Sequence, residues 1–150
     1  MRVLGVDPGV SGGYALIDGL RLIEVDDLPA AGKQIDAPQW RTIVERLDPD
    51  LAVVEAVHSM PGQGVASTFK FGMAAGLIRG VLLGARVPVV EVSPAQWKKK
   101  MGLNADAEKS RAVAIQRFPG RSDRFTRKKD HNRAEAALLA LWRVELDDPV

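Results

Sequence analysis

The sequence predicts an α/β fold, a mixed five-stranded sheet with helices on both faces. Three observations support this prediction. The chain opens with short strand-like segments separated by turn residues. Short apolar segments then alternate with longer helical ones, the order typical of sheets covered by helices. Finally, 150 residues with 46% hydrophobic and 27% charged residues are enough for one ordinary domain, so we expect residues 1–150 to form a single domain.

The first three strands follow one another without a helix. Residues 2–7 are apolar up to Asp7, and Pro8-Gly9 ends them. A second strand is expected at 14–17, and Asp18-Gly19 is a strong hairpin signal before a third strand at 20–25. A dinucleotide-binding fold would continue from its first strand into a helix, so the sequence disfavours that class.

The remaining elements are predicted from periodicity and from helix start and stop residues. Ser93-Pro94, for example, supplies a capping side chain and a proline in the first turn of a helix. Residues 119–130 are expected to form an exposed basic loop. The expected order is helix 39–47, strand 51–55, helix 65–84, strand 87–92, helix 94–100, a helix from about 104 to 118 and helix 132–146.

Charge is divided unevenly along the chain. Residues 98–133 carry a net charge of +8, whereas residues 1–97 and 134–150 each carry −3. A basic block on an otherwise acidic chain indicates a polyanionic partner. The chain has no cysteine, which excludes thiolate metal sites and a cysteine nucleophile and suits a cytoplasmic protein. We expect neither a signal peptide nor a membrane span.

Two acids occupy matching positions. Asp7 and Glu55 each end an apolar strand, and if the two strands are parallel neighbours their carboxylates lie close together. Such carboxylates repel, and a hard cation such as Mg²⁺ relieves that repulsion. Glu135 lies between alanines near the start of the last helix, and His131 is four residues earlier, on the same helix face.

These residues belong to a longer series of motifs. The chain resembles the RuvC-type Holliday junction resolvases, in particular their short phage-like branch, over nearly its whole length. The motifs that carry the resemblance, in chain order, are Gly5-Val6-Asp7-Pro8-Gly9 with Ser11-Gly12 and Tyr14, Val53-Val54-Glu55, Lys70-Phe71-Gly72 with Gly76 and Arg79-Gly80, Ser93-Pro94 with Lys98, Ala107-Glu108-Lys109-Ser110, and Ala134-Glu135-Ala136 with Leu138 and Ala140.

The resemblance implies a ribonuclease-H-like fold, a homodimer, and paired symmetric nicks in a four-way DNA junction with two Mg²⁺ (or Mn²⁺) ions per active site. It also implies four metal ligands. Asp7, Glu55 and Glu135 match three of them, and Glu135 replaces the more usual Asp. Asn132 stands where the family usually has its remaining acid, so His131, Asp130 and Asn132 are the alternatives, of which His131 is preferred for its spacing.

The basic residues have a predicted role in holding DNA. The resemblance matches Lys98 and Lys109 to family lysines that contact DNA beside the cut, and Lys109 is also assigned to the catalytic set. More distant phosphate contacts are expected from other basic residues of the same block. The whole predicted DNA-binding set is Lys98, Lys100, Lys109, Arg111, Arg127, Lys128, Lys129 and Arg133.

Other interpretations remain open at this point. The acids would look the same in another ribonuclease-H-like nuclease acting on branched DNA or RNA, and Asn132 leaves room for a junction-binding protein without catalysis. A nucleotide-dependent kinase or ATPase is disfavoured by chain length and by the lack of a Walker loop. His58 or Met60 could act as a wedge at the junction, although a plain loop is the simpler interpretation. The small residues of helix 65–84 suit a dimer contact.

Overall fold

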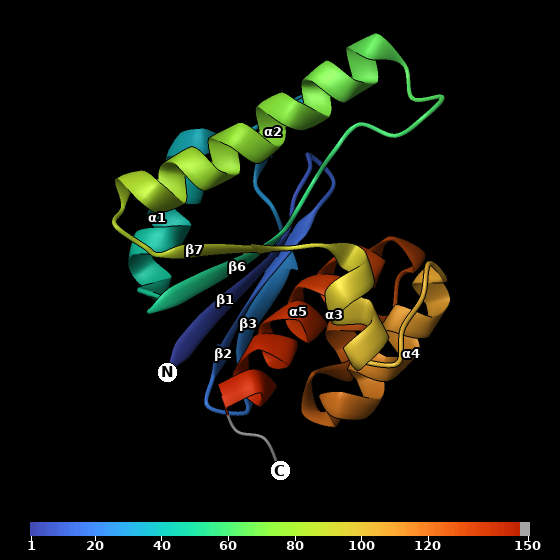
Figure 1. Ribbon diagram of the computed structural model, residues 1–150. Coiled ribbons are helices and arrows are strands. Elements are labelled where there is room, and N and C mark those ends of the chain that lie inside the picture. Colours follow the sequence, from blue (N-terminus) through green and yellow to red (C-terminus); the bar gives the residue numbers. More distant parts are fainter. Residues whose placement is uncertain (148–150) are drawn as a thin grey trace.

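The computed structural model describes residues 1–147, and it confirms the predicted fold class. Five strands form one mixed sheet in the order β3-β2-β1-β6-β7, with helices on both faces (Figure 1). The strands are β1 (Arg2–Asp7), β2 (Gly13–Asp18), β3 (Arg21–Asp27), β6 (Leu51–Glu55) and β7 (Val89–Val92). The pairs β1–β2 and β2–β3 are antiparallel, whereas β6 and β7 run parallel to β1.

Two helices cover one face of the sheet. These are α1 (Ala37–Leu47) and α2 (Val65–Gly84), and both lie above the sheet in Figure 1. Asp36 caps α1, because its carboxylate accepts a hydrogen bond from the Gln39 amide. A short hairpin, β4 (Ala30–Ala31) with β5 (Gln34–Ile35), precedes α1.

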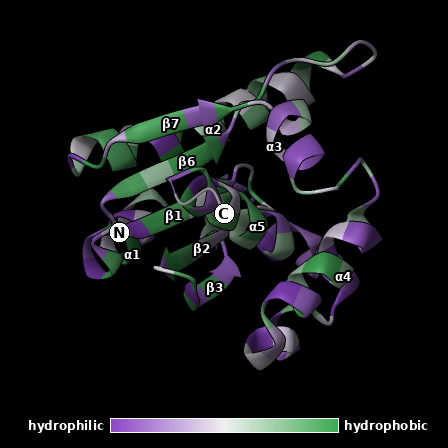
Figure 2. Ribbon diagram, turned by 60° about the horizontal axis from the view of Figure 1, so that its bottom comes forward, coloured by the Kyte–Doolittle hydropathy of each residue, from purple (hydrophilic) through white to green (hydrophobic). Residues whose placement is uncertain are grey.

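The opposite face carries the later helices, α3 (Pro94–Lys100), α4 (Ala107–Arg117) and α5 (His131–Asp147). Figure 2 shows that α5 lies against the sheet, that α3 is mostly hydrophilic and that α4 carries both hydrophilic and hydrophobic residues. The predicted cap of α3 is confirmed, since the Ser93 hydroxyl accepts from the Gln96 amide. The prediction of a loop at 119–130 is wrong, because two short 3-10 helices, η1 (Pro119–Phe125) and η2 (Lys128–Asp130), occupy it.

Strand alternation divides the core into two halves. Val3, Val53 and Val92 face α5, whereas Leu4 and Val54 face α1 and α2. Since Asp7 and Glu55 have the same parity as Val3 and Val53, both acids lie on the α5 side of the sheet.

Helix α5 approaches the sheet closely at Gly5. A Cβ atom at this position would lie 2.1 Å from the Ala136 carbonyl oxygen and 2.9 Å from the Ala140 Cβ. Only glycine therefore allows the alanine side of α5 to lie directly on β1. This contact sets the position of Glu135, which immediately precedes Ala136.

Helix α2 differs from the other helices in its exposure. It has 20 residues and is apolar enough to cross a membrane by length and composition. Only 22% of its apolar window is buried inside the protein. Helices of soluble proteins pass the same test, so this is weak support for a membrane role. The expectation of no membrane span stays a prediction.

Candidate metal centre and nucleic-acid interface

Three acids meet at the carboxyl ends of β1 and β6. In the parallel register Gly5 pairs with Val53 and Val6 with Val54, which places Asp7 beside Glu55 at the strand ends. Helix α5 adds Glu135 from the same face. One carboxylate oxygen from each of Asp7, Glu55 and Glu135 lies within 4.8 Å of the other two. These three residues are called the carboxylate cluster below.

The electrostatics of the carboxylate cluster are unfavourable in the protein alone. Burial, followed by the charges of Glu135 and Glu55, raises the pKa of Asp7 well above its usual range. Burial also raises the pKa of Glu55, and the charge of Glu135 adds to that shift. A group of converging oxygen ligands that repel one another suits a hard divalent cation, which would remove the cause of both shifts.

Two neutral side chains hold the carboxylate cluster in place. The indole N–H of Trp97, which is fully buried, donates to Glu55 Oε2 at 2.8 Å. The Ser110 hydroxyl, also fully buried, donates to Glu135 Oε1 at 3.2 Å. Hydrogen bonds of this kind fix the direction of a ligand carboxylate.

Sequence reasoning missed both of these roles. Trp97 was given no role at the site, and it is a core residue that also donates a hydrogen bond. Ser110 belongs to the motif Ala107-Glu108-Lys109-Ser110 but was given no role. The available signal was that Ser110 lies four residues before Ala114, on the same face of a mostly polar helix, because a buried hydroxyl needs a partner.

Lys98 is the basic residue at the carboxylate cluster. Its ammonium lies 2.9 Å from Glu135 Oε1, and the two side chains are 16% and 12% exposed. The same ammonium lies 5.7 Å from the centre of the Trp97 ring. The end of α3 therefore places one positive charge against the three acids.

None of the three alternatives for a fourth ligand belongs to the carboxylate cluster. Asp130 is 1% exposed and accepts hydrogen bonds from the Arg127 backbone and guanidinium. Asn132 donates its amide N–H to the Ser11 carbonyl oxygen. The preferred residue, His131, lines a separate depression with Asp106, Glu108 and Lys128. Among the described residues, the structure therefore does not bring His131 together with Asp7, Glu55 and Glu135, although His131 shares a helix face with Glu135, and its role as a ligand stays a prediction.

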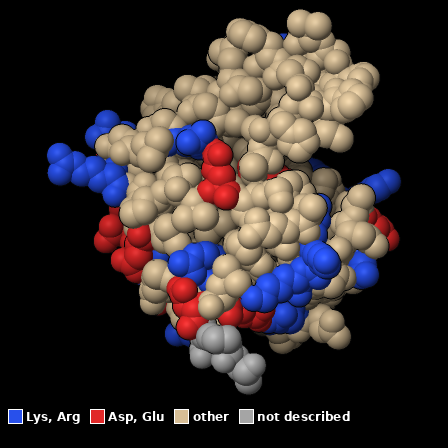
Figure 3. All heavy atoms as spheres, in the orientation of Figure 1, with Lys and Arg blue, Asp and Glu red and all other residues tan. Residues whose placement is uncertain are grey.

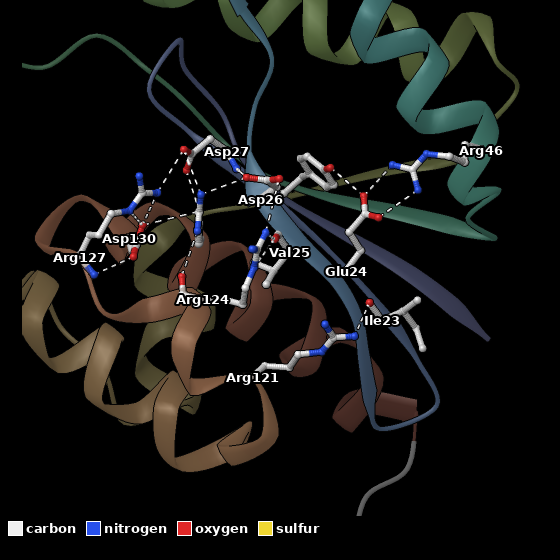
Figure 4. Close-up of polar contacts among 12 residues, drawn as sticks. Ile23, Glu24, Val25, Asp26, Asp27, Arg46, Arg121, Arg124, Arg127 and Asp130 are labelled. Carbon is white, nitrogen blue, oxygen red and sulfur yellow. Dashed lines mark hydrogen bonds and ion pairs between the residues drawn. The ribbon is translucent and has the colours of Figure 1, made fainter.

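Several predicted DNA-binding arginines are already engaged within the protein, in a group called the Arg–Asp network below. Figure 4 shows this group at the end of β3, where arginines of the 119–133 segment meet the acids of the strand. Its ion pairs include Arg133 with Asp26 at 3.0 Å and Arg127 with Asp27 at 3.3 Å. The members of the network are Asp26, Asp27, Arg124, Arg127, Asp130 and Arg133.

Three of the predicted DNA-binding arginines, Arg111, Arg127 and Arg133, are paired within the protein, and their contact with DNA stays a prediction. Arg133 is buried, with its guanidinium bound to Asp26 and Asp27. Arg111 binds Glu108 and the carbonyl oxygens of Phe125 and Thr126. Arginines that satisfy internal acceptors have fewer donors left for phosphate, so their main role is to hold the segment on the protein.

The sheet edge explains why this segment is so basic. On the edge strand β3, the carbonyl oxygens of Ile23 and Val25 accept hydrogen bonds from Arg121 and Arg124 (Figure 4). Unpaired edge groups would otherwise offer a template to another strand. Part of the charge that suggested a polyanion partner therefore serves the fold.

Most lysines of the predicted DNA-binding set differ from its arginines in lacking partners within the described part of the protein. Lys100, Lys109, Lys128 and Lys129 are exposed, and none forms an ion pair among the described residues. In Figure 3 basic atoms are prominent on the lower part of the molecule, whereas most atoms over α2 are neither basic nor acidic. His58 and Met60 lie in the exposed 56–64 segment before α2.

Comparisons with known proteins place these features in a family. No family model matches the chain. A RuvC crossover junction endodeoxyribonuclease of Chloroflexus aggregans is 35% identical over 121 residues, covering 73% of each chain. Its counterpart in Salinibacter ruber is 30% identical over 98% of this chain and 87% of the relative. The chloroplastic Holliday junction resolvase MOC1 of Chlamydomonas reinhardtii is 32% identical over 61% of this chain, which spans only 10% of that relative.

Solved structures with the same fold include two resolvases. Thermus thermophilus RuvC, determined in complex with a Holliday junction substrate, superimposes with a TM-score of 0.76 at 19% identity, covering 99% of this chain and 96% of that one. A Fowlpox virus resolvase in complex with Holliday junction DNA gives a TM-score of 0.66 at 18% identity, over 97% and 98% of the two chains. With relatives of at least 30% identity covered over more than two thirds of their length, the chain belongs to the RuvC family of crossover junction endodeoxyribonucleases.

Proposed function

We propose that this protein is a metal-dependent endodeoxyribonuclease that resolves four-way DNA junctions by paired symmetric nicks, and that it acts as a homodimer with two Mg²⁺ ions, or Mn²⁺, at each site. The carboxylate cluster carries this proposal. Three acids within 4.8 Å of one another, with the pKa of two of them raised and only Lys98 paired with them among the described residues, form a site with an excess of negative charge. Proteins maintain such a site at a cost in stability, which favours a functional role.

The chemistry follows from what each group can do. Bound cations would activate a water molecule and neutralise the charge of the scissile phosphate. Asp7, Glu55 and Glu135 would hold the cations, because their carboxylate oxygens converge at the ends of β1 and β6. Trp97 and Ser110 keep the latter two carboxylates oriented. Lys98 and the exposed Lys109 would hold phosphates next to the cut.

The dimer is supported by α2. Val65, Phe69, Met73 and Leu77 recur every four residues on one side of the helix and are 88%, 68%, 47% and 38% exposed. Glycines at 72, 76, 80 and 84 form an adjacent row in which a Cβ would meet nothing. Exposed apolar side chains beside a row of glycines suit close contact between this helix and a second copy of the chain. Two copies would provide two sites for two nicks.

The decisive experiment is a nicking assay on a mobile four-way junction and on a linear duplex of the same sequence, each with Mg²⁺ and with EDTA. We expect paired, symmetric, Mg²⁺-dependent nicks on the junction alone. Nicking of other branched DNA, or of RNA–DNA hybrids, would favour a different nuclease of this fold. Tight junction binding without nicking would favour the non-catalytic alternative.

The dimer is tested separately by measuring molar mass in solution. Phe69→Asp places a charge on the exposed side of α2 and should convert a dimer to a monomer. Leu20→Asp is the matched control, because Leu20 is 67% exposed at the β2–β3 turn and Phe69 is 68% exposed. A wild-type monomer, or dissociation by both variants alike, would contradict the proposed interface.

A further inference from the structure

Lys98, which the proposed function assigns to a phosphate contact, also forms an ion pair with the carboxylate cluster. Its ammonium is 2.9 Å from Glu135 Oε1, and this ion pair is largely buried. Among residues 1–147, no other lysine or arginine pairs with a member of the carboxylate cluster. Lys98 therefore supplies the nearest positive charge to three acids that would otherwise repel one another.

The contact also occupies a ligand atom. Glu135 Oε1 accepts from Lys98 and from the Ser110 hydroxyl at the same time. A carboxylate oxygen has few acceptor positions, so a cation cannot bind this oxygen freely while both donors remain. Ser110 is fully buried on α4, whereas the lysine stem is flexible, so Lys98 is the donor that can leave.

We propose that Lys98 is the resident counter-ion of the carboxylate cluster in the metal-free protein, and that binding of a divalent cation releases its ammonium toward the DNA backbone. The proposal rests on the proposed function, because it assumes that metal and DNA meet at this site. Lys98 is therefore a link between the two binding events, in addition to a phosphate contact.

Two consequences distinguish this role from a purely structural one. The carboxylate cluster must bind metal less tightly than it would without Lys98, because the ammonium competes for the same negative charge. In addition, metal and DNA must strengthen each other's binding through Lys98, since coupling between two sites is reciprocal. If Lys98 merely positioned Glu135, its removal would instead weaken metal binding.

The first test measures Mn²⁺ binding by titration calorimetry on metal-stripped protein without DNA. Lys98→Met should bind Mn²⁺ about tenfold more tightly than the wild type. Lys98→Arg keeps the charge and should remain near the wild-type affinity. Lys99→Met is the matched control, because Lys99 is exposed on the same helix and makes no ion pair among the described residues. Unchanged or weaker binding by Lys98→Met would overturn the counter-ion role.

The second test measures release of the lysine. Junction affinity is determined over a range of salt concentrations in EDTA and in Ca²⁺, which is used here as a non-hydrolytic cation. In EDTA the slopes of log K against log salt should coincide for the wild type and Lys98→Met. In Ca²⁺ the wild-type slope should be steeper by about 0.9, the value for one phosphate contact. An equal difference in both conditions would refute the release step.

Neither test depends on cleavage, so failure of this inference can be distinguished from failure of the proposed function. If wild-type protein nicks junctions but Lys98→Met fails the Mn²⁺ test, this inference is wrong and the proposed function stands. If no nicking occurs yet Lys98→Met binds Mn²⁺ more tightly, the counter-ion role stands and the proposed function fails. Should Lys98→Met not fold, as judged by its circular dichroism spectrum, Lys98→Gln provides the same neutral test.

Discussion

The carboxylate cluster and the Arg–Asp network contain the same kinds of charged residue and have opposite electrostatics. In the network, burial raises the pKa of Asp27, but the hydrogen bond and charge of Arg133, together with Arg127, hold it below the usual range. In the cluster the pKa of Asp7 is raised well above its usual range. Three acids meet three arginines in one region, whereas three acids meet one lysine in the other. Incomplete pairing, rather than the presence of charge, therefore distinguishes the carboxylate cluster from the network.

Removing a cluster acid should have the largest effect. Asp7→Asn eliminates a ligand carboxylate, so nicking of a four-way junction should fall by about a thousandfold or more while junction binding persists. The measurement is a time course of nicking beside a binding titration. Intact cleavage would remove Asp7 from the metal site.

The stability of the same variant, Asp7→Asn, should depend on pH in the opposite sense to that of the acids in the network. Because the folded-state pKa of Asp7 is raised, its ionisation lowers stability as the pH rises from the unfolded value near 4 through the folded pKa. For Asp27 and Asp130 the shift is downward, so their contribution is lost as the pH falls below about 4. In EDTA, Asp7→Asn should therefore melt at a higher temperature than the wild type at pH 7 and lose that advantage at pH 4. An equal advantage at both pH values would contradict the assigned cause.

Breaking the network should reduce stability more than activity. Asp130→Ala leaves the buried Arg133 guanidinium with one acid fewer and should lower the free energy of unfolding by about 3 kcal/mol. Denaturant titration measures this change. Asp123→Ala is the control, because Asp123 is exposed in the same segment and forms no ion pair among the described residues, and it should change stability by less than about 0.5 kcal/mol. Equal losses in the two variants would show that the network is not a stabilising feature.

The next effect concerns the orientation of Glu55. Trp97→Phe keeps an aromatic ring in the core but removes the N–H that donates to Glu55 Oε2, so Mn²⁺ affinity should fall by about tenfold. Trp40→Phe is a suitable comparison, since its N–H donates to the Ile78 carbonyl oxygen away from the site. Loss of Mn²⁺ affinity in Trp40→Phe alone would contradict the role of Trp97.

The smallest effect separates exposed from internally paired basic residues. Lys109→Ala should reduce the salt slope of junction binding by about 0.9, because one phosphate contact is lost. Arg133→Met should leave that slope unchanged while lowering stability, since its guanidinium is bound to Asp26 and Asp27. A reduced slope in Arg133→Met would show that the network opens to hold DNA.

Much of the fold followed from local patterns. The range 65–84 of α2 was predicted as observed, and the Ser93 cap and the strand carrying Glu55 were also correct. Errors arose where distant contacts decide structure. Residues 119–130 carry no helical periodicity, and they are ordered by arginines that reach β3, about a hundred residues earlier in the chain. Sequence spacing placed His131 on the face of Glu135 but could not give the direction of its ring.

The sequence by itself determined which residue types are present and which face of each element they occupy, because strand and helix periods are local properties. It therefore predicted Asp7, Glu55 and Glu135 as partners. Only the tertiary structure decided how charge is balanced between them, since that depends on distances between residues far apart in the chain. The Arg–Asp network is closed by contacts from β3 to α5, and the carboxylate cluster is left with Lys98 alone. Coulomb energy and desolvation depend on those distances, and the order of the amino acids does not state them.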